Sequence, residues 1–210
     1  MGDATVSVLL VDDHAVVRAG FRYLLERVDG FVVIESDSAE AAYRIYREKK
    51  PDVVVIDMSM PGIGGLEGIR RLRASDETSR IIVLSMYNDP SFVTRAVEMG
   101  ALGYLSKNCG PEELAKAIAA VMQGERYFSS DIALEAAGDA GGTEISSLST
   151  REFQVFRMLA EGASVKDIAD TLSLSPKTVN NHRSNIMEKL QIHSAVEMTR
   201  LAVREGIIDA

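Results

Sequence analysis

Four short apolar runs in the first half of the chain constrain its fold more than any other feature. They occupy residues 6–11, 53–56, 81–84 and 103–106, and stretches of helical pattern separate them. Continuous runs of this length, rich in β-branched residues, are typical of buried strands in a parallel sheet. Polar or charged residues follow each run directly, and these residues are Asp12, Asp13, Asp57, Ser85 and Lys107.

The position of these polar residues predicts a shared site. In an open α/β sheet, side chains just beyond the carboxyl ends of the strands meet in one crevice. A single Asp after a strand is usually a helix cap or a turn residue, but five polar residues at matching strand ends are difficult to explain in that way. Clustered carboxylates repel one another unless a cation lies among them. Their oxygens suit Mg2+, which proteins usually hold together with waters and phosphate oxygens.

Asp57 is the best candidate for a nucleophile at this site. It ends the expected central strand and leads into a loop rich in Pro and Gly. A carboxylate can form an aspartyl-phosphate. Lys107 would then neutralise the phosphoryl charge, and the Ser85 hydroxyl would donate to a phosphoryl oxygen.

Strands and helices alternate as far as residue 124. A further strand is expected at residues 31–36, and the helical patterns cover residues 15–28, 38–50, 66–75, 90–99 and 111–123. The pattern predicts a doubly wound (βα)5 unit, an α/β domain, in residues 1–125. Tyr127 and Phe128 are expected to pack back on this domain.

Residues 126–147 form the expected connection between two domains. Residues 131–137 are predicted to form one helix, and the Gly, Ser and Thr content of residues 138–147 is typical of a flexible linker. A second, all-α domain is expected in residues 148–210. Its helical patterns cover residues 150–161, 165–172, 176–190 and 195–205.

The second domain has clear helix starts and one very short connection. Ser149, Ser164 and Ser194 each precede an acidic residue by three positions, as in a capping box. Ser175 followed by Pro176 supplies an N-cap and an N1 proline. The second helix is joined to the N-cap Ser175 of the third by only Ser173 and Leu174, which indicates a helix-turn-helix.

The third helix of this domain has a polar outer face that suits base recognition. At 100° per residue, its apolar side is made of Val179, Ile186, Met187 and Leu190, whereas the opposite side carries Lys177, Asn180, Asn181, Ser184 and Glu188. Asn can pair with adenine through two hydrogen bonds. A merely solvated face would favour Glu and Lys, which are better helix formers than Asn and Ser. We expect Arg183 to contact phosphate, and the spacing of His182 and His193 does not suggest a metal.

The charge distribution permits DNA binding despite a net charge of −8. Basic and acidic residues are equal in number in residues 148–210, so the whole negative charge belongs to the preceding residues. A neutral domain can bind DNA through a basic face, although with modest affinity, and a dimer would help. The single Cys109 suits a reducing cytoplasm. No signal-peptide pattern or apolar run of about 20 residues is present, so no membrane contact is expected.

The first half resembles the receiver domains of response regulators, through the motifs LLVDDH, VVVIDMSMPG, VLSMYND and GYLSK. This resemblance implies a parallel sheet with strand order 2-1-3-4-5. It implies that Asp57 accepts the phosphoryl group and that Asp12, Asp13, Asp57 and the backbone carbonyl of Ser59 hold Mg2+. It also implies that Ser85 and Tyr104 form the switch pair. Many receivers have Pro after the lysine, whereas Asn108 follows Lys107 here.

The second half is similar to LuxR-type helix-turn-helix domains, so the whole chain resembles the NarL/FixJ class of two-component regulators. The motifs are LSTREFQVFRMLAEG, VKDIADTL and LSPKTVNNHRSNIMEKL. Many relatives have Lys where this chain has Asn180, which affects the expected sequence preference. The residues expected to contact DNA are Lys177, Thr178, Asn180, Asn181, Arg183 and Ser184. The last helix is the expected dimer contact, through Val196, Thr199 and Val203.

These features predict a cytoplasmic transcription regulator, not an enzyme, that a sensor histidine kinase phosphorylates on Asp57. Phosphorylation is expected to favour a homodimer that binds promoter DNA. One alternative is a DNA-binding regulator whose receiver works without phosphorylation. A second alternative is a phosphatase of the haloacid dehalogenase type, but that family has a second Asp two residues after the nucleophile, where this chain has Ser59.

Overall fold

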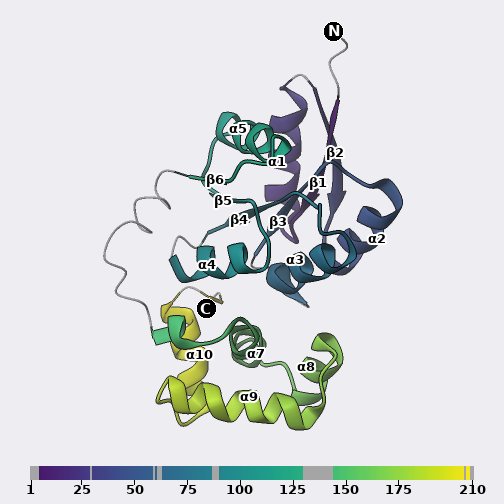
Figure 1. Ribbon diagram of the computed structural model, residues 1–210. Coiled ribbons are helices and arrows are strands. Elements are labelled where there is room, and N and C mark those ends of the chain that lie inside the picture. The colour runs from purple at the N-terminus through teal and green to yellow at the C-terminus, as the bar shows by residue number, and fades with distance from the viewer. Residues whose placement is uncertain are drawn as a thin grey trace. The chain divides into compact units, whose positions relative to one another are not determined.

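The computed structural model describes residues 5–28, 30–58, 60, 63–86, 90–129, 144–205 and 207–208 (Figure 1). The chain divides into two compact units, Met1–Ala140 and Gly141–Ala210. The expected helix at 131–137, most of the expected linker and Ser59 lie outside the described residues. Within the described ranges, no helix has the length and apolar character needed to cross a membrane.

A parallel sheet forms the centre of the first unit. Its strand order is β2-β1-β3-β4-β5-β6, and all of its neighbouring strands run parallel. The strands are β1 (Val6–Val11), β2 (Phe31–Ser36), β3 (Val53–Asp57), β4 (Ile81–Ser85), β5 (Gly103–Ser106) and β6 (Tyr127–Phe128). Every residue of β3, β4 and β5 is buried, as expected for continuous apolar strands covered on both faces. The predicted order of the first five strands is confirmed.

The sixth strand was not predicted. Tyr127 and Phe128 do return to the first unit, but they do so by pairing with β5 through the backbone. The Tyr127 N–H donates to the Leu102 carbonyl at 3.0 Å, and the Ser129 N–H donates to the Tyr104 carbonyl at 3.2 Å. β6 therefore covers the edge of β5 that a five-stranded sheet would leave open.

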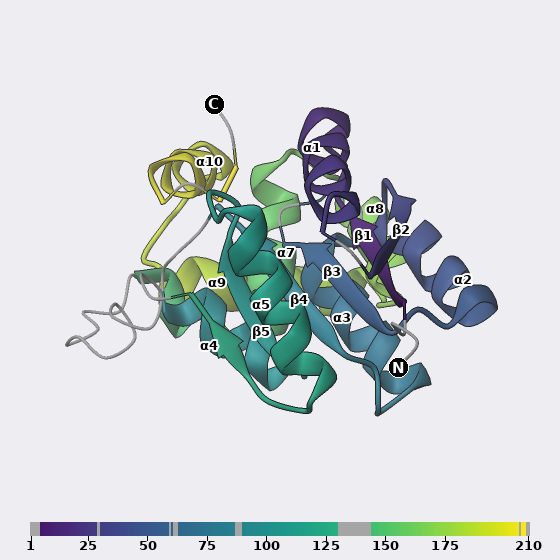
Figure 2. The same cartoon turned by 90° about the horizontal axis from the view of Figure 1, so that it is seen from above.

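Helices cover both faces of the sheet, which confirms the doubly wound fold. α1 and α5 lie on one face, and α2, α3 and α4 lie on the other (Figure 1, Figure 2). The helices are α1 (Ala15–Glu26), α2 (Ala39–Lys49), α3 (Gly64–Ser75), α4 (Pro90–Glu98) and α5 (Pro111–Met122). One core cluster joins apolar residues of α1 and α5 to β1, β3, β4 and β5. The expected start of α3 at residue 66 was wrong by two residues, and this shift bears on the site.

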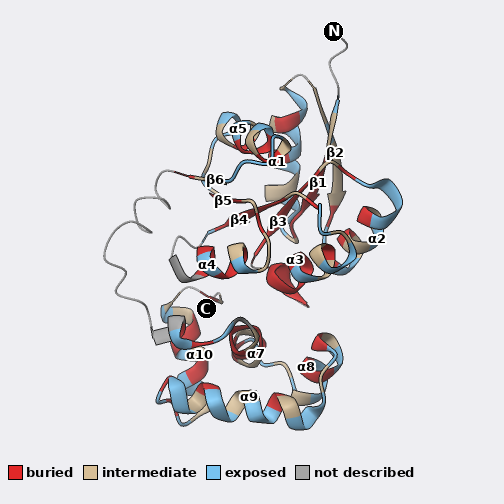
Figure 3. Ribbon diagram, in the orientation of Figure 1, coloured by how far each residue is buried: buried red, intermediate tan, exposed pale blue. Residues whose placement is uncertain are grey.

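The second unit is helical, as predicted. A short 3-10 helix, η1 (Glu144–Ser147), precedes α7 (Thr150–Ala160), α8 (Val165–Leu172), α9 (Pro176–Lys189) and α10 (Ala195–Arg204). Buried residues gather on the inner sides of these four helices, and the outer side of α9 is exposed (Figure 3). Phe156, Ile168, Val179 and Ile186 are fully buried and form the centre of this small core.

The expected serine caps are present at all four helix starts. The hydroxyls of Ser149, Ser164, Ser175 and Ser194 each accept a hydrogen bond from the backbone N–H three residues later. At Ser149 the capping box is complete, because the Glu152 carboxylate accepts from the Ser149 N–H. The connection between α8 and α9 turns at Ser173, which adopts the left-handed conformation with φ 54°. The caps therefore define where each of the four helices begins.

Candidate functional site

The ends of β1 and β3 bring three carboxylates together. Asp57 is the last residue of β3 and Asp12 follows β1 directly; both are 1% exposed. Asp13 follows Asp12 and is less buried. One ligand atom from each of these residues and from His14 lies within 4.8 Å of all the others. The three carboxylates at the strand ends therefore form one cluster, as expected, and His14, which was not expected there, joins them.

Lys107 places its ammonium group between two of these carboxylates. Its Nζ lies 2.9 Å from Asp12 Oδ2 and 2.9 Å from Asp57 Oδ2. Burial opposes the charge on Lys107, but the contacts with Asp12 and Asp57 outweigh burial and raise its pKa. The Lys107 N–H donates to the Ser85 carbonyl at 2.8 Å, which fixes the turn after β5 against the end of β4. Lys107 is therefore a charged partner of this carboxylate cluster.

The carboxylates outnumber the ammonium group, and their oxygens suit a divalent cation. The His14 N–H donates to Asp12 Oδ1 at 2.7 Å, and His14 Nδ1 lies 3.1 Å from Asp13 Oδ1. Asp13 Oδ1 is buried and, apart from the imidazole of His14, has no partner among the residues that the structure describes. A buried carboxylate oxygen of this kind needs a cation or a donor. The donor set of hard oxygen atoms therefore fits a hard metal ion.

Ser85 and Tyr104 lie on the same face of the sheet. Ser85 ends β4, Tyr104 lies in β5, and both are 0% exposed. Tyr104 is paired with Val83, two residues before Ser85, and residues two apart in a strand point to the same side. The side chains of Ser85 and Tyr104 are therefore diagonal neighbours on one face of the sheet.

The start of α3 lies close against the end of β3. The Gly65 N–H donates to the Met58 carbonyl at 3.3 Å. A Cβ atom at Gly65 would overlap the Asp57 carbonyl oxygen and lie 2.7 Å from Met58 Cα. Only glycine allows this approach, so Gly65 belongs to the structure that holds Asp57 in place.

The outer face of α9 presents most of the residues expected to contact DNA. Lys177, Asn180, Asn181 and Ser184 are exposed, and Arg183 is half-buried. The hydroxyl of Thr178 lies 2.8 Å from the hydroxyl of the N-cap Ser175. The amide-rich face is thus available on one side of the second unit.

The expected dimer residues of α10 differ in their surroundings. Val196 is 60% exposed, and Val203 is partly buried. The Thr199 hydroxyl donates to the Ala160 carbonyl at 3.3 Å and to the Ala195 carbonyl at 3.1 Å. Thr199 therefore joins α10 to the end of α7. Of the three expected dimer residues, Val196 is the most exposed.

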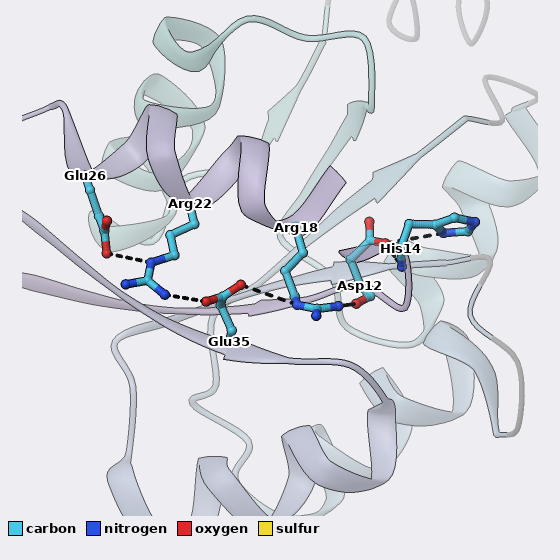
Figure 4. A network of polar contacts seen from close by, with 6 residues as sticks. All are labelled: Asp12, His14, Arg18, Arg22, Glu26 and Glu35. Carbon is cyan, nitrogen blue, oxygen red and sulfur yellow. Dashed lines mark hydrogen bonds and ion pairs between the residues drawn. The ribbon is translucent and has the colours of Figure 1, made fainter. Parts of the chain in front are cut away.

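The sequence arguments also missed a polar network beside the acidic cluster. Arg18 of α1 donates through Nη1 to the Asp12 carbonyl oxygen at 2.5 Å, and Arg18 Nε lies 3.4 Å from Glu35 Oε1 (Figure 4). No motif or periodicity indicated this contact, because one partner is a backbone carbonyl and the other lies on β2.

Two family models match the chain. Residues 8–119 match the response regulator receiver domain, and residues 146–202 match the bacterial regulatory proteins of the luxR family. The chain is 43% identical to the response regulator UvrY of Escherichia coli strain K12 over 98% of this chain and 97% of that protein. It is also 43% identical to the response regulator GacA of Pseudomonas aeruginosa over 98% of this chain and 99% of that protein.

Solved structures of similar proteins cover one or both units. A LuxR-family two-component response regulator from Aurantimonas sp. SI85-9A1 is 45% identical, covers 64% of this chain and 96% of its own, and has a TM-score of 0.62. RcsB from Salmonella enterica serovar Typhimurium, bound to promoter rprA in the presence of phosphomimetic BeF3-, is 28% identical with a TM-score of 0.77. That match covers 95% of this chain and 99% of the RcsB chain.

Proposed function

Because this chain belongs to the response regulators with a receiver domain and a LuxR-type DNA-binding domain, we propose that phosphorylation of Asp57 controls its binding to promoter DNA. The phosphoryl donor is a sensor histidine kinase, and the reaction requires Mg2+. The observation that carries the proposal is the convergence of Asp12, Asp13, Asp57 and Lys107 in one cluster. We propose domains at residues 1–125 and 148–210, to which the structure adds β6 in the first unit and η1 in the second.

In the proposed reaction, an oxygen of the Asp57 carboxylate attacks the phosphorus of a phosphohistidine on the kinase. A P–O bond forms, the P–N bond breaks, and the departing imidazole takes up a proton. Lys107 already lies 2.9 Å from Asp57 and offsets the added negative charge. When bound, Mg2+ supplies further charge neutralisation at the phosphoryl oxygens, and Asp12 and Asp13 are the side chains that would hold it, together with Asp57 and the Ser59 carbonyl.

The response to phosphorylation is proposed to pass through Ser85 and Tyr104. The Ser85 hydroxyl would donate to the new phosphoryl group, and Tyr104 would shift with it. The Ser129 N–H donates to the Tyr104 carbonyl at 3.2 Å, so a shift of β5 would reach the chain that leaves β6. The consequence we propose is a cytoplasmic homodimer in which α10 supplies the contact through Val196 and Val203.

The phosphorylation step can be tested with acetyl phosphate and the full chain. We expect one phosphoryl group per chain, located by peptide mass spectrometry on Asp57, when Mg2+ is present. EDTA should suppress the reaction, because the carboxylates that surround Asp57 repel an incoming phosphate unless a cation is bound. Phosphorylation at the full rate in EDTA would contradict the proposed metal requirement.

The DNA-binding face is proposed from the exposed residues of α9. We expect Asn180→Ala or Asn181→Ala to relax sequence preference by about 1–3 kcal/mol at one base pair, since each removes a base contact. Lys177→Ala should weaken binding to all sequences alike, because a lysine at the helix start contacts phosphate. Binding of each variant to a set of duplexes with single base changes checks this. Equal losses on every duplex for both asparagine variants would refute base reading by them.

A further inference from the structure

α1 and β2 carry a ladder, here meaning a series of linked ion pairs, that ends at the acidic cluster of Asp12, Asp13 and Asp57. Arg22 Nε lies 3.0 Å from Glu26 Oε1, and Arg22 Nη1 lies 2.6 Å from Glu35 Oε2. The other oxygen of Glu35 lies 3.4 Å from Arg18 Nε. Figure 4 shows the ladder running along α1 toward Asp12, with Glu35 between the two arginines.

Arg18 differs from Arg22 because its side chain also contacts a residue of the acidic cluster. Its Nη1 donates to the backbone carbonyl of Asp12 at 2.5 Å. Its side chain is 17% exposed, whereas that of Arg22 is 48% exposed. The Arg18 guanidinium is therefore held at two points, by a carboxylate of β2 and by a carbonyl of the β1–α1 turn.

The Asp12 carbonyl belongs to the peptide unit that joins Asp12 to Asp13. Rotation of that unit would move the two carboxylates relative to Asp57, because both side chains are attached directly beside it. The Asp12 N–H is already fixed by the Ser36 carbonyl at 3.1 Å, and the His14 N–H holds Asp12 Oδ1. Arg18 supplies the restraint on the carbonyl, which neither of these contacts provides.

We propose that Arg18 is a positioning residue for the acidic cluster. It holds the Asp12–Asp13 peptide so that both carboxylates face a bound divalent cation. This inference rests on the proposed function, because it concerns the Mg2+ that phosphorylation of Asp57 would need. Arg18 itself touches neither the metal nor the phosphoryl group. Glu35 supports Arg18 from the β2 side, and loss of Glu35 should have a smaller effect in the same direction.

Arg22 provides a matched control for Arg18. Both arginines lie on α1, both pair with Glu35, and each would lose one positive charge when replaced with glutamine. Among the contacts of the described residues, only Arg18 reaches the Asp12 carbonyl. If loss of charge or of the ion pair with Glu35 changes Mg2+ affinity, both variants should show the change. A positioning effect should appear only in Arg18→Gln.

The test measures Mg2+ binding to the unphosphorylated full chain by calorimetric titration with MgCl2, together with the melting temperature. We expect Arg18→Gln to weaken Mg2+ binding by about 10- to 100-fold, the effect typical of losing an outer-shell support. Arg22→Gln should change the Mg2+ affinity by less than about threefold, because an exposed ion pair contributes little. With acetyl phosphate, the Mg2+ concentration for half-maximal rate should rise in Arg18→Gln, and the maximal rate should largely recover at saturating Mg2+.

The outcomes separate this inference from the proposed function. If the wild-type chain binds no Mg2+, the proposed metal requirement fails. If the wild-type chain binds Mg2+ and Arg18→Gln binds it as tightly as Arg22→Gln does, the role of Arg18 is refuted. Should Arg18→Gln fail to fold, Arg18→Lys keeps a cation at the position but cannot span both partners in the same way. A folded Arg18→Lys variant with wild-type Mg2+ affinity would equally overturn the inference.

Discussion

Replacing Asp57 with asparagine is expected to abolish phosphorylation while leaving both units folded. Asparagine has nearly the same shape, but its amide lacks the charged oxygen that attacks phosphorus. Asp57 is 1% exposed and lies 2.9 Å from Lys107, which keeps Asp12 as a partner in the variant. The remaining ion pair limits the cost of removing one buried charge. Intact-mass spectrometry after incubation with acetyl phosphate and Mg2+ measures the loss, and the melting temperature reports on the fold.

Asp13→Asn is the informative control for this result. It keeps the acceptor and removes one carboxylate from the metal-binding cluster, so phosphorylation should become slower but still occur on Asp57. If the phosphoryl group were found instead on Asp12, Asp13 or a histidine, the assignment of Asp57 as the acceptor would be wrong.

Replacing Gly65 with alanine is expected to slow phosphorylation of Asp57 by about 100-fold or more, the cost of displacing a reacting group by about 1 Å. The new Cβ would overlap the Asp57 carbonyl oxygen and come within 2.7 Å of Met58 Cα, both of which are backbone atoms. Either the end of β3 or the start of α3 must move. The rate with acetyl phosphate at saturating Mg2+ measures this effect.

Gly20→Ala is the matched control for Gly65→Ala. Gly20 lies on the exposed side of α1, and a Cβ there would meet no atom within 4 Å. Alanine in a helix is favoured over glycine by about 0.5–1 kcal/mol, so this variant should be slightly more stable and equally reactive. A Gly65→Ala variant that is phosphorylated as fast as Gly20→Ala would show that the close approach of α3 does not position Asp57.

The strands β3, β4 and β5 were predictable because their apolar runs are buried on both faces, so hydrophobicity alone marks them. β6 was not, because a strand of two residues is too short to show a periodicity. Backbone hydrogen bonds from Tyr127 to Leu102 and from Ser129 to Tyr104 hold it. The start of α3 was also missed. Gly64 and Gly65 are poor helix formers, and the packing of α3 against the end of β3 outweighs that preference.

The grouping of the carboxylates with Lys107 followed from the strand-end rule, since each side chain lies directly after a recognisable strand. His14, Arg18 and Glu35 lay beyond that rule. Their contacts depend on the path of the β1–α1 turn and on the register that pairs Glu35 with Leu10 across β1 and β2. The sequence contains those residues but shows no spacing that links them.

The sequence predicted the exposed face of α9 from its helical period, and the structure places Asn180 and Asn181 on it. The period could not reveal that Thr178 contacts the Ser175 cap or that Thr199 bonds to the Ala160 carbonyl. Both contacts depend on side-chain orientation at helix ends. The helical period therefore predicts which side of a helix is exposed, but not which contacts its hydroxyl groups make within the domain.

The most direct test of the central claim compares operator affinity with and without phosphorylation. The probe is a duplex selected from a random-sequence library with the acetyl phosphate-treated full chain, and fluorescence anisotropy gives its Kd. The account predicts that phosphorylation tightens binding by roughly 5- to 150-fold in the wild type, the usual range of coupling between two sites, and leaves Asp57→Asn unchanged. Equal affinity of the phosphorylated and unphosphorylated wild-type chains for this duplex would contradict it.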